Sequence, residues 1–104
     1  MDIDAAIHHL EVEWDRVYSK GFFGKLLMGV FDAEGFERVK DLLNAAEMPD
    51  GAAIDRRFVE VTWFIPTYMR WQRDAWHLDG RETAELDRAI DYFEQRLTTI
   101  LGLP

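Results

Sequence analysis

Three polar side chains near the start of the chain have the types and spacing of a metal site. His8, Glu11 and Asp15 follow one another at intervals of three and four residues, so they share one face of a helix. Carboxylate-bridged metal sites in helical bundles need Glu-x-x-His pairs on more than one helix, and the chain has no such pair. A metal-dependent enzyme using His8, Glu11 and His77 is therefore kept only as a third hypothesis, and we expect no metal or other cofactor.

Other catalytic signatures are incomplete. The segment Gly21-Phe22-Phe23-Gly24-Lys25 lacks the longer spacer of a P-loop and the Ser or Thr that follows its lysine. Its bare GXXG matches a KH module, but two phenylalanines cannot hold a phosphate backbone. Ser19 is the only serine and lacks a G-x-S-x-G context, and the chain contains no cysteine. We assign no catalytic residue and expect a protein that is not an enzyme.

A stretch of 21 residues, 56 to 76, interleaves arginines with large aromatic residues. This mixture can stack bases and neutralise phosphates, but 20 acidic against 12 basic residues give a net charge of −8, which repels nucleic acid. The same mixture is typical of protein interaction hot spots, and the charge favours a basic partner or simply keeps the protein in solution. We therefore expect no nucleic-acid partner. The residues are Arg56, Arg57, Trp63, Tyr68, Arg70, Trp71, Arg73 and Trp76.

Hydrophobic spacing predicts the helices that must position these residues. Apolar residues recur every three or four positions in residues 2 to 18, from Asp32 to about residue 48, and again toward the end of the chain. Asp2 or Asp4 is a candidate N-cap, Asp79 with Glu82 a candidate capping box, and Gly102 a candidate C-terminal stop. The stripes are Ile3, Ile7, Leu10, Trp14 and Val17; then Phe36, Val39, Leu42, Leu43 and Ala46; and finally Leu86, Ile90, Phe93, Leu97 and Ile100.

Two stretches are harder to assign. Residues 19 to 35 contain four glycines, which predicts an apolar loop that folds back onto the core or meets a partner, and residues 48 to 51 (Met-Pro-Asp-Gly) predict a turn. Residues 52 to 76 fit either a helix or a strand, and Pro66 would kink the helix or end the strand. We favour the helix. The predicted fold is all-α, a single helical domain over residues 1 to 104. It is a compact four-helix bundle whose third helix is kinked at Pro66, and the alternative is α+β with a short strand near 57 to 65.

On a helical projection, Trp63 lies opposite the core face in a row with Arg56 and Arg70, flanked by Phe64 and Trp71. These aromatic residues either pack internally after a change of direction at Pro66 or form a contact surface. The first functional hypothesis is a non-catalytic interaction domain that docks on a protein partner or a second copy through this surface. An immunity-type or antitoxin-type neutraliser of a basic protein is one version.

The second functional hypothesis is a small-molecule site. An aromatic pocket within the bundle would hold an apolar ligand, with an arginine to orient an anionic group. Its lining would be Phe22, Phe23, Tyr68, Trp71 and Trp76.

Membrane and export signals are not visible in the sequence. The N-terminus, Met-Asp-Ile-Asp, lacks the features of a signal peptide, and the longest apolar stretch, Phe22 to Phe31, includes Lys25. That stretch is far shorter than the roughly 20 residues that span a bilayer. We expect a cytoplasmic protein without a membrane partner, which suits a chain without cysteine.

Overall fold

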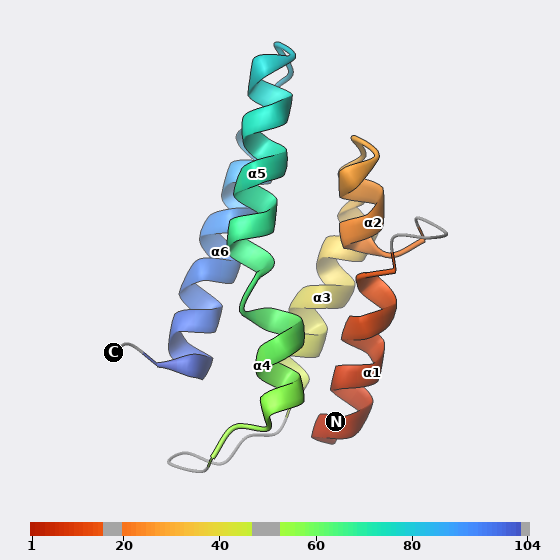
Figure 1. Ribbon diagram of the computed structural model, residues 1–104, viewed down its shortest axis with the longest axis vertical. Coiled ribbons are helices and arrows are strands. Elements are labelled where there is room, and N and C mark those ends of the chain that lie inside the picture. Colours follow the sequence, from red (N-terminus) through yellow and green to blue (C-terminus); the bar gives the residue numbers. More distant parts are fainter. Residues whose placement is uncertain (16–19, 47–52, 103–104) are drawn as a thin grey trace.

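Helices are the only regular secondary structure in the part of the chain that the computed structural model describes, residues 1–15, 20–46 and 53–102. The chain rises through the first two helices, descends, rises through the next two and descends again (Figure 1). The all-α prediction is confirmed, while the four expected helices become six within these residues. The six are α1 (Ile3–Glu13), α2 (Phe22–Leu27), α3 (Ala33–Ala45), α4 (Arg56–Thr62), α5 (Ile65–Leu78) and α6 (Ala84–Leu101).

Helix α1 begins where its N-cap was predicted. The Asp2 carboxylate accepts a hydrogen bond from the Ala5 amide at 3.1 Å and so satisfies one of the free donors of the first turn. Ile7 and Leu10 of the predicted stripe are buried. The helix ends at Glu13, and Val17, the last position of that stripe, lies outside the described residues, as does the turn predicted at 48–51.

Helix α2 corrects the prediction of a loop over residues 19 to 35. Phe22 and Phe23 are fully buried in this six-residue helix, so this part of the segment packs onto the core, whereas Leu27, Met28 and Val30 are exposed. Gly21 has an extended backbone (φ −83°) that any residue can adopt, but a Cβ there would lie 2.3 Å from the backbone oxygen of Glu13. The glycine is therefore required for close approach between α1 and α2.

The segment predicted as one kinked helix consists of two helices, α4 and α5. The helical hydrogen-bonding pattern is interrupted at Trp63 and Phe64, and Pro66 lies in the first turn of α5. A proline there loses no helical hydrogen bond, because the first amides of a helix have no partner within it. The alternative strand near 57 to 65 is wrong, since residues 56 to 62 are α-helical.

Helix α6 packs along α5 and ends as predicted. Gly102 forms its C-cap with a φ of +85°, a conformation that glycine adopts without strain. Its start differs from the prediction, because Thr83 is the N-cap and the proposed Asp79 and Glu82 capping box lies before the helix. The core that joins all six helices is built around Phe22, Phe23, Phe58, Phe93, Leu10, Leu26, Leu43, Ile65, Met69 and Leu86.

Candidate interaction surface

An aromatic surface formed by Trp63, Phe64 and Trp71 lies where α4 meets α5. Trp63 is 58% exposed and Trp71 is 59% exposed. The half-buried Phe64 ring lies between them, with its centroid 5.2 Å from each of the other two rings. Both tryptophans are therefore exposed rather than packed internally, while Phe64 packs against the core.

The break between the two helices sets the positions of these rings. Trp63 is the C-cap of α4 and Phe64 the N-cap of α5, so the two residues flank the change of direction. The inner side of Phe64 meets Tyr68 and Trp14, at ring-centroid distances of 6.2 and 6.4 Å. Phe64 thus connects the exposed tryptophans to the core.

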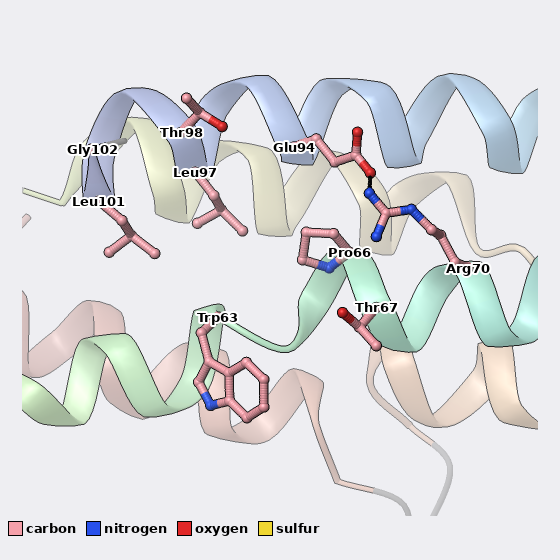
Figure 2. A pocket seen from close by; sticks show the side chains of 9 residues that line it. All are labelled: Trp63, Pro66, Thr67, Arg70, Glu94, Leu97, Thr98, Leu101 and Gly102. Carbon is pink, nitrogen blue, oxygen red and sulfur yellow. Dashed lines mark ion pairs between the residues drawn. The ribbon is translucent and has the colours of Figure 1, made fainter. Parts of the chain in front are cut away.

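A groove of about 410 Å³ runs beside Trp63, between α5 and the C-terminal half of α6 (Figure 2). We call it the α5–α6 groove. Arg70 of α5 pairs with Glu94 of α6 at one end, and Leu101 lies toward the other. The groove is lined by Trp63, Pro66, Thr67, Arg70, Glu94, Leu97, Thr98, Leu101 and Gly102.

A smaller hollow of about 280 Å³ lies between α1 and α4, and Phe64 is one of the residues that line it. We call it the α1–α4 notch. Trp14, Val61 and Phe64 form its apolar part, and Glu11 and Glu60 contribute carboxylates from the two helices. Sequence reasoning placed Trp14 in the core and did not associate Glu11 with Glu60, because the notch exists only where α1 and α4 meet.

The two arginines predicted to belong to the surface are held by carboxylates of the same chain. Arg56 is highly exposed and bonds Glu60 one turn away at 3.2 Å, while Arg70 bridges to Glu94 across the α5–α6 groove. Both lie close to Trp63 in the sequence, and Arg70 also lines the groove with it. Exposed pairs of this kind contribute about 0–1 kcal/mol, so they can exchange for a partner's charges.

The residues predicted for a small-molecule pocket are brought together only in part. Phe22 and Phe23 are in ring contact within the core, and the Tyr68 hydroxyl donates a hydrogen bond to the Phe23 carbonyl at 2.7 Å. Trp71 lies in the aromatic surface, and Trp76 packs beneath Arg81, whose guanidinium is 3.8 Å from the ring centroid. In the described residues no direct ring contact links Trp71 or Trp76 to the other three.

The residues of the metal hypothesis are also separate. His8 and Glu11 are exposed on α1, and His77 is exposed in the last turn of α5. Among residues 1–15, 20–46 and 53–102, no three His, Cys, Asp or Glu side chains form a group that could hold a metal ion.

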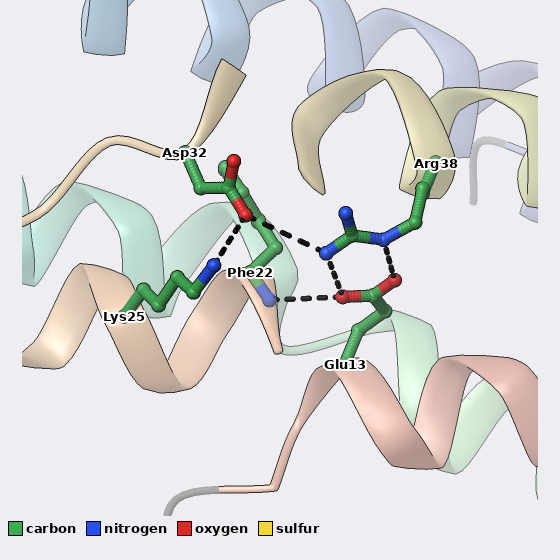
Figure 3. Close-up of polar contacts among 5 residues, drawn as sticks. All are labelled: Glu13, Phe22, Lys25, Asp32 and Arg38. Atoms are coloured by element: carbon green, nitrogen blue, oxygen red, sulfur yellow. Dashed lines mark hydrogen bonds and ion pairs between the residues drawn. The ribbon is translucent and has the colours of Figure 1, made fainter. Parts of the chain in front are cut away.

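A polar network that sequence reasoning missed holds α2 against α1 and α3 (Figure 3). The buried Glu13 carboxylate accepts hydrogen bonds from the Phe22 amide at 2.9 Å and from Arg38 Nε at 2.8 Å. Asp32 accepts a hydrogen bond from Lys25 at 3.0 Å and lies 3.5 Å from Arg38. Because all partners of Glu13 depend on the packing of α1, α2 and α3, spacing in the sequence gives no signal for this network.

The same network shifts the pKa values of Arg38 and Asp32. The hydrogen bond with Glu13 raises the pKa of Arg38 against the opposing effect of burial. Burial alone would raise the pKa of Asp32, but Lys25, the nearby backbone of Gly35 and the charge of Arg38 together lower it. Ionised Asp32 therefore stabilises the folded protein more than protonated Asp32 does.

Comparison with protein-family models, curated proteins and solved structures finds no match to this chain. Within the described segments, each helix is too short or too polar to cross a bilayer. A proposed function therefore depends on the exposed surface and its geometry.

Proposed function

We propose that this protein is a non-catalytic interaction domain that binds a protein partner through the aromatic surface of Trp63, Phe64 and Trp71. The observation that supports this most directly is the exposure of two tryptophans, 58% and 59%, on either side of one anchored phenylalanine. Tryptophan is enriched among the residues that dominate protein interfaces. Together with Phe64, which packs against the core, the pair offers an apolar contact.

The tryptophans supply the centre of an interface rather than its whole area. An aromatic side chain covers about 150–250 Å² when it is buried, so covering the remainder of both rings removes roughly 200–300 Å² from water. At about 25 cal/mol per Å² this contributes ~5–7 kcal/mol before the costs of association. A standard interface buries about 800 Å² on each side, so the adjoining groove and notch must contribute the rest.

Charge favours a different protein over a second copy of the chain. Two copies would each carry a net charge of −8 and repel one another, whereas a basic protein would be attracted. A neutraliser of a basic toxin or enzyme, sharing the cytoplasm with its target, is one version of this proposal. Native mass measurement of the purified protein tests self-association directly, and we expect a monomer.

The proposal is tested by affinity capture from the source cells with the wild-type protein, Trp63→Ala and Trp71→Ala. Leu78→Ala is the matched control, because Leu78 is 86% exposed at the far end of α5. We expect the tryptophan variants to lose a captured protein that the wild type and the Leu78 variant retain. Thermal unfolding must show that all variants remain folded. Equal capture by all four proteins would contradict the proposal.

A further inference from the structure

We infer that the α1–α4 notch accepts an arginine or lysine side chain from a basic segment of the partner. The inference rests on the proposed function, because the notch and the aromatic surface share Phe64. A partner seated on the exposed tryptophans would lie beside the notch and could insert one side chain into it.

The chemistry of the notch matches a long cationic side chain. Its apolar part, Trp14, Val61 and Phe64, suits the aliphatic stem, and the carboxylates of Glu11 and Glu60 suit the charged head. Aromatic rings also attract cations. Its volume of about 280 Å³ falls just below the range of about 300–1,000 Å³ typical of small-molecule pockets, which favours a single side chain as the occupant.

The apolar part is already fixed before any partner arrives. The indole N–H of Trp14 donates a hydrogen bond to the Val61 carbonyl at 2.8 Å and ties α1 to α4. The same ring stacks on the buried Phe23 ring, with centroids 4.0 Å apart and planes 18° apart. A preformed site avoids part of the ordering cost of binding.

The carboxylates of the notch are available to an incoming cation. Glu11 is exposed and makes no ion pair with any other described residue. Glu60 pairs with Arg56, whose side chain is 92% exposed, so the pair is solvated and readily exchanged. The net charge of −8 adds a general attraction for basic segments. Complementarity of charge therefore favours a basic partner as the occupant.

The test is a titration of ¹⁵N-labelled full-length protein with N-acetyl-arginine methylamide, followed by NMR. The Trp14 indole N–H resonance reports on the notch, and that of Trp76 serves as a reference. We expect the Trp14 signal to shift saturably. Glu11→Gln and Glu60→Gln should each weaken binding about threefold to fivefold, the value of one exposed ion pair. Glu85→Gln removes the same charge at an exposed position of α6 and should leave binding nearly unchanged.

The uncharged citrulline derivative is the second control, and it should leave the Trp14 resonance in place. Equal shifts with arginine and citrulline, or equal weakening by Glu85→Gln, would overturn the inference. So would a Trp14 shift that grows with protein concentration alone, which would identify a second copy as the occupant. If Trp63-dependent capture persists without any arginine effect at Trp14, only this inference fails. If the arginine derivative shifts the Trp14 resonance saturably but capture does not depend on Trp63, the notch inference stands and the proposed function fails.

Discussion

Replacing Glu13 by glutamine tests how α2 is held in the fold. Glu13 is 5% exposed, and its carboxylate accepts hydrogen bonds from the Phe22 amide and from two nitrogens of Arg38, at 2.9, 2.8 and 3.1 Å. Glutamine has nearly the same shape but only one acceptor oxygen. In Glu13→Gln the amide NH₂ must therefore face either the Phe22 N–H or the Arg38 guanidinium, which are both donors.

The expected cost follows from these contacts. A hydrogen bond to a charged group contributes about 1.5–3 kcal/mol, and a buried donor without an acceptor costs about 1–3 kcal/mol. The Arg38 side chain is 46% exposed, so water recovers part of its loss. We expect Glu13→Gln to lower the free energy of unfolding by about 2–4 kcal/mol, a large share of the ~5–15 kcal/mol typical of a domain.

Urea unfolding, followed by tryptophan fluorescence and far-UV circular dichroism, measures this loss. Glu11→Gln is the matched control, because Glu11 is exposed on the same helix and should change stability by less than about 0.5 kcal/mol. Combining Glu13→Gln with Arg38→Gln should give less than the sum of the single losses, because the two residues interact directly. A Glu13→Gln protein within ~0.5 kcal/mol of wild type would refute the view that this carboxylate anchors α2.

The same unfolding assay checks three further expectations. Gly21→Ala should cost at least ~3 kcal/mol because its Cβ meets backbone atoms, whereas Gly35→Ala should cost less, about 1–2 kcal/mol, because the ends of the Asp32 and Arg38 side chains can shift but the Cβ of the buried Phe22 cannot. Trp76→Ala, at an 8% exposed position, should cost about 3–5 kcal/mol, and Trp71→Ala less than ~2 kcal/mol because Trp71 is 59% exposed. Because the pKa of Asp32 is lowered in the fold, its contribution is fully present above about pH 4 and is lost as the pH falls through the folded-state pKa. The difference in stability between wild type and Asp32→Asn should therefore shrink in acid, and a constant difference would contradict the assigned pKa shift.

The candidate surface could be predicted from the sequence only in part. Helical spacing placed Trp63, Phe64 and Trp71 away from the core face, and the structure shows both tryptophans exposed. It did not show that Phe64 would be half buried against Trp14, nor that a groove would open beside Trp63. Those features depend on the break between α4 and α5 and on neighbouring helices, which a projection of one helix does not contain.

The sequence by itself determined what depends on neighbours along the chain. The all-α class, the buried stripes of α1 and α6, the Asp2 N-cap and the Gly102 C-cap all follow from spacing and capping within a few residues. Tertiary structure decided the rest. Helix α2 forms in a glycine-rich segment because Gly21 lets the helix approach Glu13. The Glu13 carboxylate accepts a hydrogen bond from the first amide of α2. The notch likewise is lined by Glu11 of α1 and Glu60 of α4, which lie on different helices. These contacts join residues far apart in sequence, and their energies depend on burial and distance, which exist only once the helices have packed.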